Sequence, residues 1–302
     1  MEFQREYIEL FNQVQIRYYG IIIVLAMLIA AWVAARLAKR SGYDPDHVWG
    51  ALTWAIIPGI VGARLWFILF PPSTLTAGCI ENAAAGAVCQ NTLWFLQNFF
   101  NVNNGAIAIW SGGLSIFGAV IGGALGTVLY LRRNKLPIWP WLDIAGVALP
   151  LGQAIGRWAN FINQELYGIP TTLPWGITIQ SSKRVAPYTS TIDFPAETLF
   201  HPLFLYESLW SMIAFFVLLN LYLRFRSRLM AGDIFLLYVI QYAFIRFFLE
   251  FIKVEPAYIW GTMINSSQVM SVVAFVAALG LFVYRHRPGL ADSKTAAQSP
   301  AA

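Results

Sequence analysis

The sequence predicts an all-α integral membrane protein with about seven transmembrane helices. Of its 302 residues, 58% are hydrophobic and only 12% are charged, and the mean hydropathy is +0.59. Soluble domains carry about 25% charged residues, so this balance excludes an ordinary soluble fold. Apolar segments long enough to cross the hydrocarbon core as helices recur along nearly the whole chain, and no soluble domain is left between them.

The predicted spans follow these apolar segments in order. The first residues mix charged and apolar side chains too closely for the core of a cleaved signal peptide, so we expect the first span to stay in the mature protein. Residues 1–287 then form a single membrane-embedded domain, and the small, polar residues 288–302 form a disordered cytoplasmic tail. The spans are expected at 18–36, 48–70, 106–131, 137–160, 202–223, 232–252 and 267–284.

Lysine and arginine orient the spans, because cytoplasmic loops carry an excess of positive charge. Twelve of these residues fall on one side of the predicted membrane and five on the other. We therefore expect the N-terminus outside and the C-terminus in the cytoplasm. The twelve are Arg36, Lys39, Arg40, Arg132, Arg133, Lys135, Arg224, Arg226, Arg228, Arg285, Arg287 and Lys294, and the five are Arg5, Arg17, Lys183, Arg184 and Lys253.

Small extracytoplasmic loop or arm segments are predicted near 71–105 and 169–201. The first contains no lysine or arginine, and the second is rich in proline, threonine and serine and is expected to form short strands or loops. Cys79 and Cys89 both fall in the first segment, and whether they form a disulfide is left open. Before the first span, apolar residues at helical spacing predict an amphipathic helix in the outer interface, with a disordered leader as the alternative. These residues are Phe3, Tyr7, Leu10 or Phe11, and Val14.

The orientation places polar residues from several spans at one depth, near the outer surface. An arginine at the centre of a span costs about 2.5–3.5 kcal/mol, so such residues need partners, water or a functional anion. Guanidinium groups bind phosphate through paired hydrogen bonds, and the expected ligand is therefore an anionic phospholipid of the outer leaflet. In the alternative, a structural network, Arg157 and Arg246 snorkel or pair with Glu165 and Glu250. The layer contains Tyr19, Arg64, Ser111, Arg157, His201, Glu207 and Arg246.

Other kinds of site are disfavoured. The outer layer has one histidine and no HExxH motif or cluster of cysteines, so neither a metal nor another cofactor is expected. The chain also lacks the GxSxG motif of serine hydrolases and a phosphate-binding P-loop. The net charge of +5 is accounted for by the loop asymmetry, so no nucleic-acid partner is expected. Asp143, near the cytoplasmic end of the fourth span, is expected to cap that helix or to pair with the adjoining basic turn.

The stretch GRWANFINQELYG, residues 156–168, ends the fourth span with polar side chains where an apolar helix would simply stop. Five further stretches carry the rest of the layer and its glycines. They are RYYG, GARLWFILF, SGGLSIFGAVIGG, HPLFLYE and IRFFLEFIKVEP. In order and spacing this series resembles the prolipoprotein diacylglyceryl transferase family. Its signature matches here at Arg157, Asn160, Asn163, Glu165 and Gly168.

The resemblance implies a multi-pass enzyme of the bacterial plasma (inner) membrane, with its active site toward the outer leaflet and residues 1–287 as a catalytic domain. Such an enzyme moves the diacylglyceryl group of phosphatidylglycerol to the thiol of the lipobox cysteine in a preprolipoprotein signal peptide. A thioether forms and glycerol phosphate is released, which is the first step of bacterial lipoprotein maturation. The implied partners are phosphatidylglycerol, the signal peptide and membrane lipids, and a monomer is the simplest assembly.

The resemblance and the residue chemistry together predict roles in that reaction. Arg157 and Arg246 would clamp the phosphodiester and stabilise charge on the leaving oxygen. Many family members have a histidine in the third-span motif, where this chain has Phe117. The thiol proton would then go to His201, to Glu250 or Glu165, or to no dedicated base if the cationic site lowers the pKa of the thiol. The predicted headgroup site contains Arg157, Arg246, Tyr19, Asn160, Asn163, Arg64, Glu165 and Gly168.

Two other functions are compatible with parts of the pattern. A transporter or flippase for an anionic lipid or solute also uses buried arginines and glycine-rich helices, but it is expected to place polar residues through the midplane, where this chain is nearly all apolar. A non-catalytic relative that binds lipid or a signal peptide is the second alternative, and Phe117 is the reason to consider it.

Overall fold

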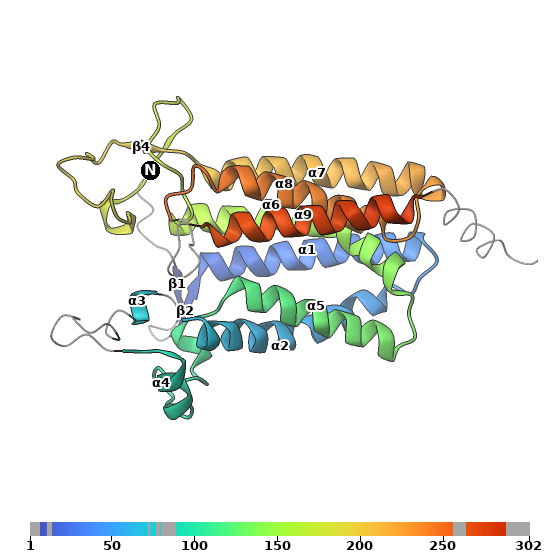
Figure 1. The fold of residues 1–302 in the computed structure, drawn as a ribbon, viewed down its shortest axis with the longest axis horizontal. Coiled ribbons are helices and arrows are strands. Elements are labelled where there is room, and N and C mark those ends of the chain that lie inside the picture. Colours follow the sequence, from blue (N-terminus) through green and yellow to red (C-terminus); the bar gives the residue numbers. More distant parts are fainter. Residues whose placement is uncertain are drawn as a thin grey trace, which may run out of the picture. The chain divides into compact units, whose positions relative to one another are not determined.

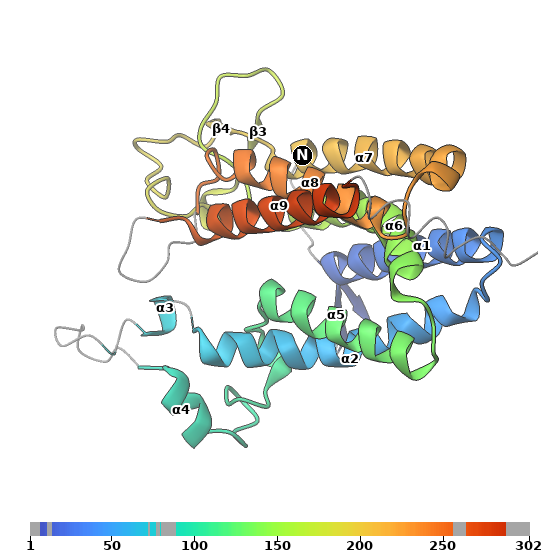
Figure 2. The same ribbon diagram turned by 45° about the vertical axis from the view of Figure 1, so that its right-hand side comes forward.

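The structure is a computed structural model that describes residues 7–10, 14–71, 73–76, 79, 89–255 and 264–287. The chain divides into two compact units. Unit 1 combines Met1–Ser41 with Trp139–Ala302, and unit 2 is Gly42–Ile138. The spanning helices of both units are drawn in Figures 1 and 2. The tail expected at 288–302 lies outside the described residues.

Long apolar helices confirm the predicted all-α membrane fold. Within the described chain, six helices are long and apolar enough to cross a membrane, by length and composition. They are α1 (Tyr18–Arg40), α2 (Asp46–Leu69), α5 (Ile116–Arg133), α6 (Ile138–Asn163), α7 (Leu203–Phe225) and α9 (Ser266–Arg285). α8 (Asp233–Leu249) takes the place of the sixth predicted span but has only 17 residues. The number of seven spans therefore stays a prediction.

The third predicted span begins ten residues later than expected. We predicted residues 106–131, whereas α5 begins at Ile116. The preceding residues form turns around the side chain of Arg64 and include one 3-10 turn, η2 (Ile109–Ser111). Gly112 and Gly113 have φ angles of +90° and +67°. A positive φ at two successive residues interrupts a helix, so the predicted span cannot run through them.

The segment before α1 is a β-hairpin, so the predicted amphipathic helix is wrong for the part described. β1 (Tyr7–Leu10) pairs antiparallel with β2 (Val14–Arg17). The sequence of β2, VQIR, alternates apolar and polar residues with the period of a strand, and its β-branched residues favour extended backbone. Phe3 and Phe11 lie outside the described residues.

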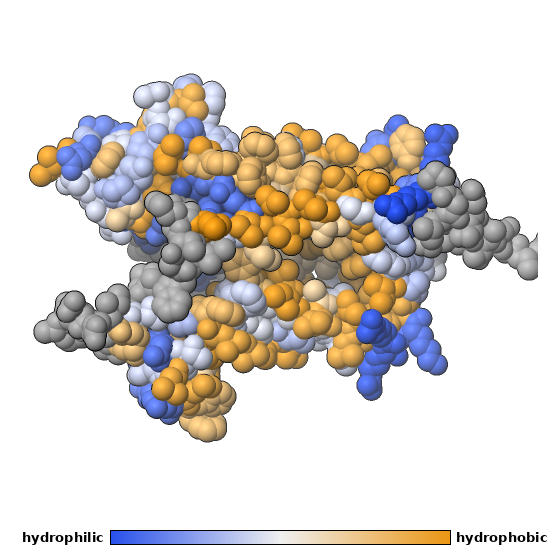
Figure 3. All heavy atoms as spheres, viewed as in Figure 1, coloured by the Kyte–Doolittle hydropathy of each residue, from blue (hydrophilic) through white to orange (hydrophobic). Residues whose placement is uncertain are grey.

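Unit 1 contains α1, α6, α7, α8 and α9, which run side by side in Figures 1 and 2. Glycines of α6 allow the closest approaches. A Cβ on Gly152 would lie 3.3 Å from the side chain of Ala30 in α1, and one on Gly146 would lie 2.9 Å from the Cα of Phe235 in α8. In α6 and α7, 44% of the most apolar stretch is buried, against 11% in α9. α6 and α7 therefore form the interior of unit 1, and its remaining apolar surface faces outward, as the hydropathy colouring of Figure 3 shows.

Asp143 of α6 holds the start of α8. Its carboxylate oxygens accept hydrogen bonds from the backbone N–H groups of Gly232 (2.6 Å) and Phe235 (3.1 Å). We expected this residue to cap its own helix or to pair with the basic turn. It instead caps a neighbouring helix, whose first N–H groups have no intrahelical partners.

The second outer segment follows α6 and contains short strands, as predicted. β3 (Ile177–Thr178) pairs antiparallel with β4 (Leu199–Phe200). The buried guanidinium of Arg184 holds the loop between them by donating to four backbone carbonyls. The acceptors are the oxygens of Ile179 (2.9 Å), Phe194 (2.5 Å), Pro195 (3.0 Å) and Ala196 (3.1 Å). Tyr167 packs beneath the strands against Phe200, and this burial raises the pKa of its hydroxyl.

Unit 2 is built on α2 and α5, which pack through glycines. A Cβ on Gly59 would lie 3.4 Å from the carbonyl oxygen of Ala119, and Gly62 and Gly118 leave no room for a Cβ because each lies against the backbone of the other. Small residues at such positions let two helices approach closely in a membrane. The glycine run of α5 therefore serves helix packing.

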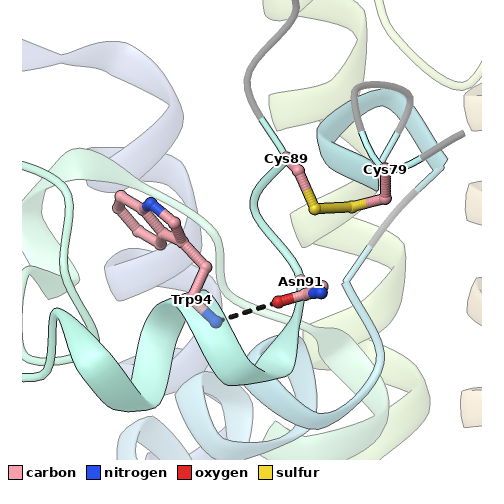
Figure 4. The surroundings of a disulfide bond; sticks show 4 residues. All are labelled: Cys79, Cys89, Asn91 and Trp94. Carbon is pink, nitrogen blue, oxygen red and sulfur yellow. Dashed lines mark hydrogen bonds between the residues drawn. A yellow bond between two sulfur atoms is a disulfide. The ribbon is translucent and has the colours of Figure 1, made fainter. Parts of the chain in front are cut away.

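The first outer segment lies in unit 2 and carries a disulfide. Cys79 and Cys89 are bonded, with Cα atoms 4.7 Å apart, which resolves a question that the sequence left open (Figure 4). Two short helices flank this bond, α3 (Ser73–Thr76) and α4 (Thr92–Gln97). The side chain of Asn91 accepts a hydrogen bond from the N–H of Trp94 at 2.9 Å and so caps α4 (Figure 4).

Candidate functional site

One carboxylate joins three helices in unit 1. Glu207 lies in the first turns of α7 and is 3% exposed. Its Oε1 accepts a hydrogen bond from Nη2 of Arg157 on α6, and its Oε2 lies 3.5 Å from Nη1 of Arg246 on α8. The hydroxyl of Tyr242 donates to the same Oε1 at 3.4 Å. The two arginines predicted to clamp a phosphate thus belong to one cluster, although they are far apart in sequence.

The cluster continues from Arg246 toward the end of α8. Nη2 of Arg246 donates to Glu250 at 2.9 Å, and Nζ of Lys253 lies 3.3 Å from the other oxygen of the same carboxylate. The side chain of Glu250 is fully buried. Because both of its oxygens are paired with cations, Glu250 fixes the direction of Arg246.

A second chain of hydrogen bonds runs from Arg157 to the end of α6. Nη1 of Arg157 donates to Oδ1 of Asn160 at 3.2 Å, and Nδ2 of Asn160 donates to Glu165 at 2.7 Å. The hydroxyl of Tyr19, at the start of α1, lies close to the side chain of Asn160. Four residues of the predicted headgroup site therefore meet here. Asn163 is the last residue of α6, and its side chain forms no hydrogen bond to another described residue.

The backbone after α6 explains why this cluster follows a helix end. Glu165 turns back so that its N–H donates to the carbonyl of Asn160 at 3.0 Å, between two residues with φ of +54°, Gln164 and Leu166. Gly168 then passes between the segments that carry His201 and Lys253. A Cβ there would lie 2.7 Å from the carbonyl oxygen of Ile252. Gly168 is thus required for close packing of the loops that frame the cluster.

His201 lies beside this cluster but is not joined to it by a hydrogen bond between described residues. Its backbone carbonyl accepts from the N–H of Gly168 at 2.9 Å. Its Nδ1 lies 3.0 Å from the hydroxyl of Tyr206, which accepts a hydrogen bond from Nε1 of Trp175 at 2.9 Å. These contacts orient the imidazole through Nδ1, and no described residue is bonded to Nε2.

Arg64 belongs to unit 2 and has a different environment. Its guanidinium donates to the backbone carbonyls of Ala106 (2.8 Å), Gly112 (2.7 Å), Gly113 (3.1 Å) and Gly105 (2.5 Å). The residue is 6% exposed. All three of its nitrogens are therefore committed to the turns that precede α5. Phe117 lies in the first turn of that helix, with its ring 5.9 Å from the ring of Trp66.

The cluster in unit 1 is balanced in charge. Three cations, Arg157, Arg246 and Lys253, face three carboxylates, those of Glu165, Glu207 and Glu250. Exposure is not balanced. The arginine side chains are 19% and 21% exposed, whereas those of Glu207 and Glu250 are 4% and 0% exposed. Glu165 is exposed, so an anion that reaches the cluster would meet this carboxylate as well as the two partly exposed guanidinium groups. Among the described residues, no group of three or more His, Cys, Asp or Glu side chains is arranged to hold a metal.

Comparison with known proteins identifies the family. The sequence model described as "Prolipoprotein diacylglyceryl transferase" matches residues 5–284. The chain belongs to the prolipoprotein diacylglyceryl transferase family. This membership confirms the resemblance seen in the sequence motifs and identifies the fold as that of a family of membrane enzymes.

Individual relatives agree with this assignment. A protein of Chloroflexus aggregans is 38% identical over 295 residues, which cover 93% of this chain and 88% of that protein. A protein of Leifsonia xyli subsp. xyli is 40% identical over 245 residues, 80% of this chain and 66% of that protein, and one of Pediococcus pentosaceus is 34% identical over 276 residues, 91% and 87%. All three bear the name phosphatidylglycerol--prolipoprotein diacylglyceryl transferase.

In unit 1, this diacylglyceryl transferase family member also has a mostly apolar groove. It has a volume of about 350 Å³ and runs between α8 and α9. Phe247, which directly follows Arg246, lines it from α8, and Gln268, Val269 and Val272 line it from α9. Five of the seven lining residues are apolar, with Asn265 and Gln268 as the polar ones.

Glu207 is the site residue to which the sequence analysis gave no role. It was placed in the outer layer, but the expected partners of the arginines were Glu165 and Glu250. Only the second of these pairings is direct, because Asn160 stands between Arg157 and Glu165. A signal was present: two arginines in separate spans require a shared counter-ion, and Glu207 was the third carboxylate of the layer.

Proposed function

We propose that this protein transfers the diacylglyceryl group of phosphatidylglycerol to the thiol of a lipobox cysteine in a preprolipoprotein, and that the Arg157–Glu207–Arg246 cluster is its active site. In this reaction the sulfur forms a bond to the terminal glyceryl carbon, the bond from that carbon to the phosphate oxygen breaks, and glycerol phosphate leaves with the electron pair. The thiol loses its proton. The names of the relatives contain both substrates.

One observation carries the proposal: two partly exposed arginines from different helices are fixed by one buried carboxylate. Glu207 faces one terminal nitrogen of each guanidinium, and Asn160 and Glu250 accept from the other terminal nitrogen of Arg157 and Arg246. Each terminal nitrogen carries a second N–H, and these second N–H groups are assigned to the phosphate oxygens. Since guanidinium pairs bind phosphate through parallel hydrogen bonds, two of them hold the phosphodiester in a fixed direction. The charge that develops on the leaving oxygen is stabilised by donors that need no rearrangement.

The remaining predicted residues support this clamp in different ways. Tyr19 and Asn160 reach the exposed side of Arg157 and are assigned to the glycerol headgroup, and Glu165 holds Asn160 in place. Asn163, at the open end of α6, is assigned to the same headgroup. Glu250 orients Arg246. In unit 2, Arg64 is assigned a structural role: it holds the turns before α5 and does not bind the headgroup directly.

The thiol proton is assigned to His201. Glu250 is enclosed by Arg246 and Lys253, so its carboxylate is not available to a substrate. His201 is partly exposed, and its Nδ1 is oriented by Tyr206. Its Nε2 is bonded to no described residue and is therefore assigned to accept the proton. Phe117 cannot accept a proton, so the base, where one is used, must come from elsewhere in the chain.

The apolar groove between α8 and α9 is assigned to an acyl chain of phosphatidylglycerol. A lipid whose phosphate is held by Arg246 must place its acyl chains in an apolar environment, and the groove begins at the neighbouring Phe247. Because the chain comes from bilayer hydrocarbon and not from water, its contact with the groove contributes packing rather than hydrophobic transfer energy. This contact contributes to the selection of a lipid over a free headgroup phosphate.

We place the protein in the bacterial plasma membrane as a monomer, with its N-terminus outside and its active site toward the outer leaflet. The asymmetry of lysine and arginine supports this orientation. So does the disulfide between Cys79 and Cys89, because such bonds persist in oxidising compartments outside the cytoplasm. The cluster needs residues of a single chain only.

A reconstituted assay tests the proposal against its alternatives. Purified protein in vesicles of phosphatidylglycerol receives a lipobox peptide, and the release of glycerol phosphate is measured together with the mass of the peptide. We expect release that depends on the cysteine of the peptide and is absent when serine replaces it. Movement of labelled phosphatidylglycerol between leaflets without release would indicate a flippase, and peptide binding without release would indicate a non-catalytic relative.

A further inference from the structure

The outer segment of unit 2 exposes large apolar side chains although it is not a span. Residues 91–114, which we call the apolar arm, comprise α4 and the turns up to the start of α5. Leu93, Leu96, Phe100 and Trp110 are 60%, 58%, 81% and 67% exposed. Figure 3 shows hydrophobic residues gathered over α4 and the turn after it. Water is a poor solvent for so many adjacent apolar side chains.

The exposure is a property of an ordered segment. Phe95 of α4 is 2% exposed and packs on Ile68 and Phe67 of α2, so the opposite side of α4 must face outward. In the following turns, N–H of Ile107 donates to the carbonyl of Phe99 at 3.2 Å, and Nε1 of Trp110 donates to the carbonyl of Val102 at 2.8 Å. The one polar atom of the Trp110 ring is thus satisfied inside the turn, and the apolar part of the ring is left facing out.

The charge of the arm is equally distinctive. Residues 89–114 contain no Asp, Glu, Lys or Arg. The other outer segment, 169–201, has four such residues, Lys183, Arg184, Asp193 and Glu197. A loop surrounded by water normally carries charge, whereas a segment rich in Trp and Phe without charge suits the boundary between headgroups and acyl chains.

The apolar surface of the arm is continuous with that of a membrane span. The hydroxyl of Thr92, the first residue of α4, donates to the carbonyl of Leu69 in the last turn of α2 at 3.3 Å. Leu65, Leu69 and Phe70 are themselves 53%, 57% and 62% exposed. The exposed apolar side chains at this end of α2 therefore lie close to the start of the arm, which also exposes uncharged polar residues such as Gln97 and Asn101.

From these observations we infer that the apolar arm inserts into the outer leaflet at the headgroup boundary and that its occupant is lipid, not a protein partner. The inference rests on the orientation given under the proposed function. Asn91 and the disulfide at Cys89 hold the start of α4, so the arm enters the membrane as a fixed element of unit 2 (Figure 4). It anchors the end of α2 at which the turns around Arg64 are formed.

Nitroxide labels measure the insertion directly. The two natural cysteines are bonded to each other, so a single introduced cysteine takes the label. We would label Phe100→Cys in the arm, Leu65→Cys on α2 as the hydrocarbon reference, and Glu197→Cys in the charged outer segment as the water reference. The protein is placed in vesicles of phosphatidylglycerol and phosphatidylcholine, and collisions with oxygen and with a water-soluble nickel chelate are compared.

The expected ratio of oxygen to nickel collisions at position 100 is several-fold above that at position 197 and approaches that at position 65. A ratio at 100 equal to that at 197 overturns the inference. So does a label at 100 that meets nickel freely in vesicles and is shielded only when a lipobox peptide is added, since the occupant would then be the peptide. Leu96→Cys repeats the measurement if the Phe100 variant does not fold. The collision ratios need no turnover, so they stand whether or not the transferase assay succeeds.

Discussion

Arg157 and Arg246 share a single counter-ion, the carboxylate of Glu207, although the three residues lie on three different helices. This arrangement keeps two cations near one another without leaving either unpaired in a low-dielectric region. It also determines where an anion can bind, because Glu207 occupies the buried side of both guanidinium groups. In the proposed site, the positions of the arginines therefore depend on a residue to which no contact with the substrate is assigned.

Glu207→Gln tests this dependence. The amide keeps the shape of the side chain but removes the charge, so the two arginines repel one another and lose their common direction. Breaking a buried pair costs about 3–5 kcal/mol, and a misplaced clamp lowers the rate by roughly 10²-fold. The melting temperature in detergent and the rate of glycerol phosphate release are the two measurements. The exposed Glu197→Gln variant is the control, and a Glu207→Gln protein with normal rate and stability would show that the shared carboxylate is not needed.

Replacing each arginine by lysine tests the phosphate clamp. Lysine keeps the positive charge but loses the planar pair of donors, so Arg157→Lys and Arg246→Lys should each reduce the rate of lipidation on the order of 10²–10³-fold. The stability of each lysine variant should fall much less than that of a variant with alanine at the same position, because the charge opposite Glu207 is kept. Lys183→Arg, in the outer loop, is the matched control. Full lipidation by both lysine variants would mean that bidentate binding has no part in the reaction.

His201→Asn tests the assignment of the thiol proton. A free cysteine thiol has a pKa of about 8.5, so without a base the reaction depends on the small thiolate fraction present at neutral pH. The variant should be slow at pH 7 and should approach the wild-type rate as the pH rises past that value. A rate profile parallel to that of the wild type would assign the proton to solvent, with the cationic site lowering the pKa of the thiol. Tyr206→Phe keeps the imidazole but removes the hydrogen bonds of the hydroxyl to Nδ1 of His201 and to Nε1 of Trp175, and it should show a smaller loss.

Arg64→Met separates a structural role from headgroup binding. The structure commits this guanidinium to four carbonyl oxygens, and removing it leaves buried acceptors unsatisfied, at about 1–3 kcal/mol each. We expect a clear loss of thermal stability and faster proteolysis between residues 98 and 115, with the KM for phosphatidylglycerol unchanged in the protein that stays folded. A raised KM at normal stability would instead return Arg64 to the headgroup site.

The helices could be predicted from the sequence because apolar length alone determines them, and their ends lay mostly within a few residues of the prediction. The two errors, at residues 7–17 and 106–115, occurred where local pattern competes with tertiary contact. The turns before α5 depend on hydrogen bonds from Arg64, which is more than 40 residues away. The spacing of apolar residues in the sequence cannot predict a contact over that distance.

The site could be predicted only in part, for the same reason. The spacing of residues showed which arginines needed partners but not which carboxylate reached them. Glu165 and Glu250, the expected partners of the arginines, are each near one of them in sequence. Glu207 instead approaches both arginines from a third helix. Two long-range contacts, Arg157–Glu207 and Arg246–Glu207, therefore had to come from the packing of α6, α7 and α8.

The apolar groove between α8 and α9 leads to a prediction about lipid selection. Val269→Trp places a large ring in a space of about 350 Å³ whose walls include Phe247, so a long acyl chain would have to leave it. The KM for phosphatidylglycerol with long chains should rise several-fold, whereas the KM for a short-chain analogue and the kcat for both should change little. Val276→Trp, on the same helix and 62% exposed at its valine, is the matched control, because this position does not line the groove. If both variants raise the KM equally, or if neither distinguishes long from short chains, the acyl chain of the bound lipid lies elsewhere. A selective loss in the first variant alone would connect the guanidinium of Arg246 to the hydrocarbon of the same lipid molecule.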